Sequence, residues 1–106
     1  MPYLIIEILK FVEAYQPGII ECAFTDANGG VHTIVGKVPY FTVKELWWDS
    51  VYPQRGNARC EVLDMFQGFN GSPLARITIS RPDDLESTDG LTEFIVQQSQ
   101  VSDELS

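Results

Sequence analysis

The sequence predicts an all-β fold: an antiparallel sandwich or small barrel of about six strands, with one short helix in a crossover. Two observations favour this fold class. Short segments that alternate apolar and polar residues recur along the chain, and Gly, Pro, Asn and Asp separate them. Strands that recur between turn signals, with almost no helix, are typical of sandwiches and small barrels.

Three strands are expected in the first half of the chain. Residues 3 to 15, YLIIEILKFVEAY, fit either a helical stripe or a strand, and their enrichment in Ile and Val favours the strand. Gln16-Pro17-Gly18 predicts a turn, after which residues 19 to 26 alternate with the period of a half-buried strand. Asp26 to Gly30 can adopt the positive φ of a tight hairpin, so residues 31 to 38 should return antiparallel.

One short helix is predicted from about Val43 to Asp49. Thr42 and Glu45 have the spacing of a capping box, in which each side chain satisfies a free backbone N–H group at a helix start. Trp47 and Trp48 fall within this segment, and adjacent residues of a helix point about 100° apart. We therefore expect one tryptophan to be buried at an end of the barrel and the other to lie nearer its rim.

The second half of the chain predicts three more strands, within residues 59 to 69, 74 to 81 and 91 to 97. Asn70-Gly71-Ser72-Pro73 turns the chain between the first two, which should form a second hairpin. The acidic loop PDDLESTDG leads to the third strand.

Length and composition predict a single domain. The 106 residues are 44% hydrophobic and 11% aromatic, which is enough for one buried core, and no repeat or linker marks a second unit. We expect this domain to cover residues 1–97 and a flexible C-terminal tail to cover residues 98–106.

The longest apolar segment, LIIEILKFV, is far shorter than the ~20 residues of a membrane span. It also lacks the basic flank and cleavage site of a secretory signal, so we expect a cytoplasmic protein without membrane contact. Cys22 and Cys60 should then be reduced, buried thiols.

Acidic residues dominate the charge of the chain. Fifteen Asp and Glu against seven Lys and Arg give a formal net charge of −8. The cations are scattered singly, whereas a phosphate backbone is bound by clustered Lys and Arg, so nucleic acid is not expected as a direct ligand. A cationic protein is the electrostatic complement, and the alternative is that the charge only keeps the protein soluble.

No catalytic or cofactor signature is evident. His32 is the single histidine, and no metal-ligand spacing, GxGxxG motif or phosphate-binding loop is present. We expect no enzyme activity, no cofactor, no metal and no catalytic residue, with His32 in a structural or solvent-facing role. The alternative is a ligand or catalytic site in a barrel mouth formed by Trp48, His32 and Cys22.

The candidate binding site is the acidic loop together with exposed aromatic residues. Three interpretations of the loop compete: a solvated loop, a calcium site without the EF-hand spacing, and a patch that binds a basic partner. Aromatic residues would supply the anchors of the partner-binding patch. The residues predicted to bind a partner are Asp83, Asp84, Glu86, Asp89, Trp48, Tyr52 and Phe69.

The segments ECAFTDANGGVHTIVGKVPYFT (residues 21 to 42), CEVLDMF and ESTDGLTEFIV resemble small acidic β-rich bacterial proteins of mostly unknown function. Size, acidity and β content also resemble, at the level of class, the immunity proteins of contact-dependent growth-inhibition systems with ribonuclease-type toxins. That resemblance implies a stoichiometric inhibitor that binds and blocks a basic nuclease toxin in the cytoplasm. The alternative is a non-inhibitory β-barrel module that binds another protein.

Overall fold

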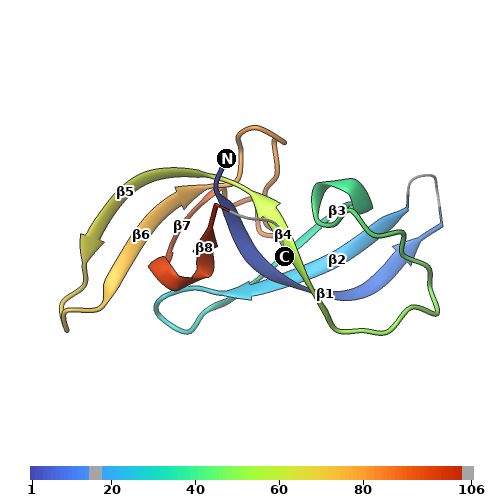
Figure 1. The fold of residues 1–106 in the computed structure, drawn as a ribbon, viewed down its shortest axis with the longest axis horizontal. Coiled ribbons are helices and arrows are strands. Elements are labelled where there is room, and N and C mark those ends of the chain that lie inside the picture. The colour runs from blue at the N-terminus through green and yellow to red at the C-terminus, as the bar shows by residue number, and fades with distance from the viewer. Residues whose placement is uncertain (15–17, 104–106) are drawn as a thin grey trace.

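Two antiparallel sheets make up the computed structural model, which describes residues 1–14 and 18–103 (Figure 1). Within those residues the strands are β1 (Tyr3–Glu13), β2 (Ile19–Thr25), β3 (Val31–Lys37), β4 (Gln54–Arg59), β5 (Glu61–Gln67), β6 (Pro73–Thr78), β7 (Glu93–Gln97) and β8 (Val101–Ser102). Two short 3-10 turns, η1 (Val38–Tyr40) and η2 (Gln98–Gln100), complete the described elements. The all-β prediction, compatible with a sandwich, is confirmed.

The larger sheet has the strand order β3-β2-β1-β4, with β8 beside the first residues of β1. The predicted hairpin of residues 19 to 38 is confirmed, because β2 and β3 pair from Ile19↔Lys37 to Thr25↔Val31. Residues 3 to 13 form a strand and not a helix. Most of the predicted Gln16-Pro17-Gly18 turn lies outside the described residues, and only Gly18, with φ +97°, is described.

The smaller sheet has the order β5-β6-β7. The predicted hairpin around residues 70 to 73 is confirmed by the antiparallel pairing of β5 with β6. The chain passes from β4 to β5 through Cys60, whose backbone N–H donates to Pro2 O at 3.1 Å, and so crosses from the larger sheet to the smaller one (Figure 1). The two sheets are therefore joined without a connecting helix.

One apolar cluster lies between the sheets. Alternate residues of β1, β2 and β7 point inward, as expected for half-buried antiparallel strands. The cluster includes Leu4, Ile6 and Ile8 of β1 and Ala75, Ile77 and Val96 of the smaller sheet, all of them buried. No helix in the described part of the chain combines the length and apolar content needed to cross a membrane.

The predicted helix from Val43 to Asp49 is wrong, because this segment consists of bends and a turn. Thr42 Oγ1 accepts a hydrogen bond from Lys44 N at 3.1 Å, so the capping pattern closes a local turn instead of a helix. A helix of two turns has little stability by itself. In this segment Phe41 and Leu46 are instead buried in the core, and their burial fixes the path of the chain.

Strand β4 was not expected, because its residues QRGNAR have little preference for strands. Pairing with β1 from Tyr3↔Arg59 to Ile8↔Gln54 stabilises it. Gly56 fits there because an added Cβ would lie 2.8 Å from Phe41 O and 2.9 Å from Ile8 Cδ1. The strand therefore forms because of its pairing and close packing in the folded protein, and not because of the preferences of its own residues.

Residues 98–102, which were expected to belong to a flexible tail, form hydrogen bonds with both sheets. Gln98 Nε2 donates to Leu74 O at 3.0 Å, and Gln100 Nε2 donates to Thr25 O at 2.7 Å. Val101 and Ser102 then pair with the first residues of β1. Residues 104–106, the end of the predicted tail, lie outside the described residues.

Candidate functional site

The acidic loop joins β6 to β7 over residues 79–92 and is held to both sheets. Leu85 is buried in the core, and its N–H donates to Ile79 O at 3.0 Å. Thr88 N donates to Thr33 O at 2.9 Å, which ties the loop to the outer edge of β3. Buried side chains and backbone hydrogen bonds therefore hold the part of the backbone that carries the exposed carboxylates.

The four predicted carboxylates of this loop divide into two kinds. Asp83 has a side chain only 6% exposed and accepts two hydrogen bonds from Arg59, one of them from Nε at 2.9 Å. Asp84, Glu86 and Asp89 are exposed, and none forms an ion pair with any described residue. Asp83 therefore stabilises the loop, and three carboxylates remain available to a partner.

The arginines of this region are all engaged within the molecule. Arg59 donates to Asp83, Arg76 donates to Glu93 at 2.8 Å, and Arg81 forms an ion pair with Glu61 at 3.1 Å. The hydrogen bonds and charge of Asp83 raise the pKa of Arg59 above its usual value. The charges of Asp84, Glu86 and Asp89 are thus not neutralised locally.

Both tryptophans are exposed, so the expectation that one of them is buried is wrong. Trp47 is 54% exposed and Trp48 is 77% exposed. Tyr52 is half-buried against the core and donates its hydroxyl to Trp47 O at 2.6 Å. The expectation assumed a helix, in which adjacent side chains point about 100° apart, and this segment is not helical. Phe41 and Leu46 supply its buried apolar side chains instead.

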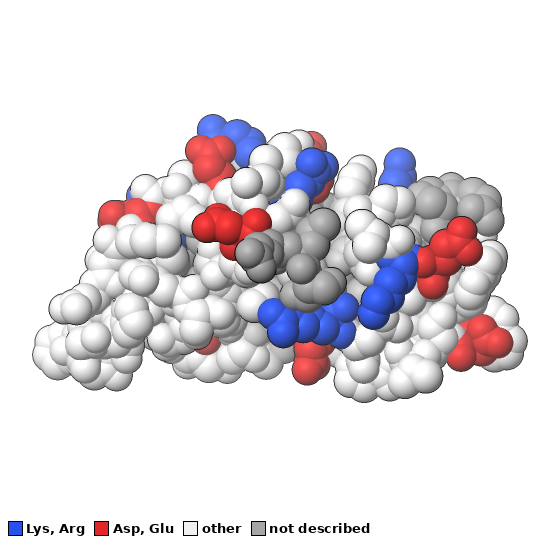
Figure 2. All heavy atoms as spheres, viewed as in Figure 1, with Lys and Arg blue, Asp and Glu red and all other residues white. Residues whose placement is uncertain are grey.

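The structure does not bring the predicted binding residues together. Fully exposed Phe69 lies in the β5–β6 turn at the left end of Figure 1, whereas Trp48 and Tyr52 lie in the connection from η1 to β4, toward the right. The acidic loop lies between these two ends. Acidic and basic side chains are interspersed on the face shown in Figure 2, so the negative charge does not form one continuous patch there.

His32 packs between two aromatic rings and bonds the preceding turn. Its ring centroid lies 5.3 Å from that of Phe24 and 4.7 Å from that of Phe94. Its Nε2 is 2.7 Å from Asp26 Oδ2, so Nε2 carries the proton and donates to the carboxylate. This hydrogen bond makes the largest contribution to lowering the pKa of Asp26. The carboxylate also accepts hydrogen bonds from Asn28 N and Gly30 N.

The alternative site in a barrel mouth would need an accessible thiol at Cys22. Cys22 is fully buried, and burial raises its pKa to about 12; burial likewise raises the pKa of Cys60 to about 11. A thiol with such a pKa supplies almost no thiolate at neutral pH. Among the residues described, no group of three or more His, Cys, Asp and Glu side chains is placed to hold a metal ion.

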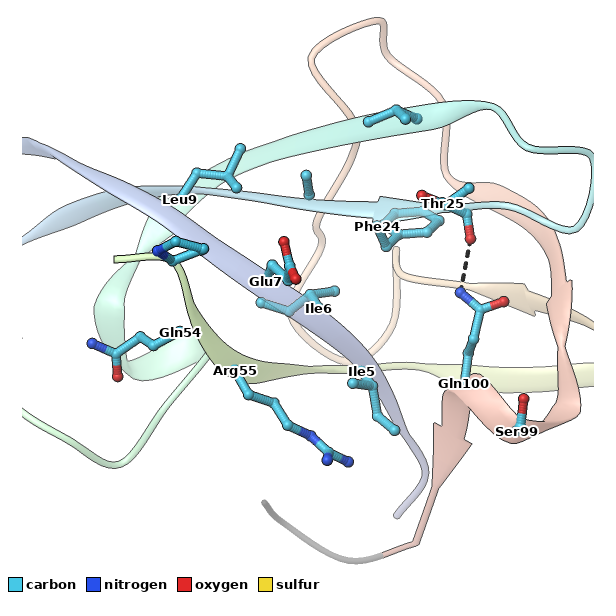
Figure 3. A pocket seen from close by; sticks show the side chains of 13 residues that line it. Ile5, Ile6, Glu7, Leu9, Phe24, Thr25, Gln54, Arg55, Ser99 and Gln100 are labelled. Atoms are coloured by element: carbon cyan, nitrogen blue, oxygen red, sulfur yellow. Dashed lines mark hydrogen bonds between the residues drawn. The ribbon is translucent and has the colours of Figure 1, made fainter. Parts of the chain in front are cut away.

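Two depressions that the sequence reasoning missed lie on the larger sheet. The first, of about 880 Å³, lies on the outer face of β1 beside Ile5, Leu9 and Ala23, with Glu7 and Arg55 among its lining residues (Figure 3). The second, of about 600 Å³, lies between Phe11, Val38 and Trp47. Apolar residues at outward positions of β1 and β3 were the sequence signal for the first.

Comparison with known proteins gave no match. Neither the family models, nor the curated proteins, nor the solved structures include one that matches this chain. The functional argument therefore depends on the exposed surfaces of the molecule.

Three surfaces are available for binding. They are the acidic loop, the apolar connection that carries Trp48, and the outer face of the larger sheet. The first has unpaired negative charge, the second has exposed aromatic and aliphatic area, and the third combines apolar side chains with charges of both signs.

Proposed function

We propose that the chain is a cytoplasmic immunity protein that binds and blocks a basic nuclease toxin, with the acidic loop over residues 79–92 as its contact surface. The proposed partner is a cationic protein of the ribonuclease type. The proposed binding residues on the loop are Asp84, Glu86 and Asp89, while Asp83 positions the loop through Arg59.

The observation that carries the proposal is the alternation of exposed and buried side chains along the loop. Asp84 and Glu86 are exposed on either side of buried Leu85, and buried Ser87 follows. Ser87 N donates to Leu91 O at 2.8 Å, and Leu91 N donates to Ser87 Oγ at 3.0 Å. A loop that is already fixed loses little conformational freedom on binding.

The chemistry of a ribonuclease site suits such a loop. A groove that binds RNA is lined by cations that contact phosphate oxygens, and carboxylates can occupy the same positions. Their attraction acts over a Debye length of about 8 Å at physiological salt and accelerates association. Arg81 is the one cation among residues 79–92, and it is paired with Glu61, so it opposes this attraction little.

The test is the association rate with a basic ribonuclease-type toxin domain, measured by stopped-flow fluorescence at several salt concentrations. The variant is Asp84→Asn with Glu86→Gln and Asp89→Asn. We expect its association rate to fall by about tenfold or more at low salt, with a weaker salt dependence and weaker inhibition of RNA cleavage.

A matched control distinguishes an effect of the loop carboxylates from an effect of the lower net charge of the whole protein. Glu45→Gln, Asp49→Asn and Asp64→Asn together remove three exposed carboxylates that form no ion pair with described residues elsewhere on the molecule. The control should bind nearly as fast as the wild type. Equal slowing of both triple variants, or an unchanged rate for the loop variant, would contradict the contact surface proposed here.

A second candidate function is a non-inhibitory module that binds another protein through an apolar surface. The connection from η1 to β4 favours it, because Val43, Trp47, Trp48 and Val51 are all exposed within nine residues. Aromatic residues of this kind dominate the energetics of many interfaces. Trp48→Ala should then weaken binding to the partner strongly, and salt should have little effect on binding. Adding the wild-type chain to a ribonuclease should leave the activity of that ribonuclease unchanged.

A further inference from the structure

The outer face of the larger sheet carries several apolar side chains. Because Leu4, Ile6 and Ile8 of β1 point into the core, Ile5, Glu7 and Leu9 point outward. The register places Ala23 on this face beside Glu7, and Val35 beside Glu21. Antiparallel sheets usually place polar side chains on the face that contacts water.

This face is electrically neutral in a strongly acidic protein. The register places three acids, Glu7, Glu13 and Glu21, and four cations, Lys10, Lys37, Arg55 and Arg59, on it, and Asp83 neutralises Arg59. The whole chain has fifteen acids against seven Lys and Arg. Two copies of a chain with net charge −8 repel each other, and this face is where they can approach with the least repulsion.

Glu7 and Arg55 are opposite each other in the β1–β4 register, yet the structure records no ion pair between them. Figure 3 shows Arg55 extending toward Ile5 and away from Glu7. Both side chains line the depression of about 880 Å³. A two-fold axis through this face would place each Arg55 opposite Glu7 of the second copy, and the contact would occur twice.

We propose that the outer face of the larger sheet is a dimer interface between two copies of this chain. The sheets pack face to face, as in a sandwich, with reciprocal Glu7–Arg55 ion pairs beside an apolar centre of Ile5, Leu9 and Ala23. The exposed side chain of Val31, at the edge of the depression, contacts the second copy.

The size of the face sets the expected affinity. Four strands about 4.8 Å apart and about seven residues long give a footprint of about 19 by 23 Å. A standard interface buries about 800 Å² on each partner, so a footprint of about 440 Å² lies below the standard range, among weak and transient contacts. We therefore expect a weak dimer, with a dissociation constant in the micromolar range.

Sedimentation equilibrium over the low to high micromolar range tests the proposal. The wild type should dimerise, and Arg55→Glu and Glu7→Arg should each raise the dissociation constant by about tenfold or more, because each places like charges together twice. The double reversal should restore dimerisation to within about threefold of the wild type. Lys44→Glu, an equal charge change on an exposed residue outside the face, should have little effect.

Three results would overturn the proposal: a monomeric wild type at the highest concentration, equal weakening by Lys44→Glu and Arg55→Glu, or a double reversal as weak as the single variants. Circular dichroism establishes that each variant is folded. If Glu7→Arg does not fold, Val31→Asp replaces it, and a folded Val31→Asp protein that dimerises like the wild type also overturns the proposal. The toxin-binding test is independent, since it alters only residues outside this face.

Discussion

His32 and Asp26 form a hydrogen-bonded pair across the β2–β3 turn, with Nε2 and Oδ2 2.7 Å apart. The other oxygen of Asp26 accepts from the backbone N–H groups of Asn28 at 2.8 Å and Gly30 at 2.9 Å. One carboxylate therefore closes the turn and orients the single histidine between Phe24 and Phe94. The hairpin predicted from turn residues is stabilised by a contact with the apolar core.

The pH dependence of stability should reflect Asp26. Its pKa is lower in the folded protein than in the unfolded chain, so its contribution is present above about pH 4 and is lost as the pH falls through the folded pKa. Asp26→Asn should lower the free energy of unfolding by about 1–2 kcal/mol at neutral pH. Urea unfolding should show the difference from wild type shrinking in acid; a pH-independent difference, or an equal effect of exposed Asp89→Asn, would contradict this assignment.

Phe41, and not a tryptophan, should be the aromatic residue on which folding depends in the segment before β4. The Phe41 ring is buried in the core and packs beside Gly36, so Phe41→Ala should cost about 3–5 kcal/mol. Trp48→Ala should change stability by no more than about 0.5 kcal/mol. Chemical denaturation of the two variants measures both values, and similar losses would show that Trp48 is packed.

The carboxylates of the acidic loop should differ in their effect on stability. Asp83→Asn removes the partner of Arg59 from a nearly buried position and should lower the melting temperature clearly. Asp84→Asn and Asp89→Asn should leave the melting temperature almost unchanged, because these side chains are exposed. Differential scanning calorimetry provides the measurement. Arg59→Gln combined with Asp83→Asn should be less destabilising than the sum of the two single variants.

The two thiols should react slowly in the folded protein. Burial raises the pKa of Cys22 to about 12 and that of Cys60 to about 11, and both side chains are inaccessible. Labelling with a thiol-specific disulfide reagent near pH 8 should therefore be at least about a hundredfold slower than in the unfolded chain. Guanidinium-unfolded protein is the control and should release two equivalents at once. Fast labelling of either thiol without denaturant would show that this part of the core opens readily.

Sequence patterns correctly predicted the elements whose signals are local. The β2–β3 hairpin follows from alternating apolar residues and a turn in which Gly29 has φ +84°. The β5–β6 hairpin follows from similar signals around Gly71, with φ +81°. Each depends on residues that are close together in the chain, so period-two alternation and turn chemistry are enough.

The candidate site was only partly predictable. The sequence indicated an acidic loop and exposed aromatic residues, and the loop does present Asp84, Glu86 and Asp89. It did not show that Asp83 is bound by Arg59, 24 residues earlier, or that Phe69 and Trp48 lie far from the loop. Ion pairs and surface clusters form between segments that are distant in sequence.

By itself, the sequence determined the all-β class, the hairpins, the buried thiols and the net charge, because alternation, turn residues and composition act locally or over the whole chain. Tertiary structure alone decided that residues 43–49 form no helix, that QRGNAR becomes β4, that residues 98–100 dock on β6 and β2, and that residues 101–102 pair with β1. In each of these segments weak local preferences were overridden by pairing with β1 or by burial of Phe41 and Leu46.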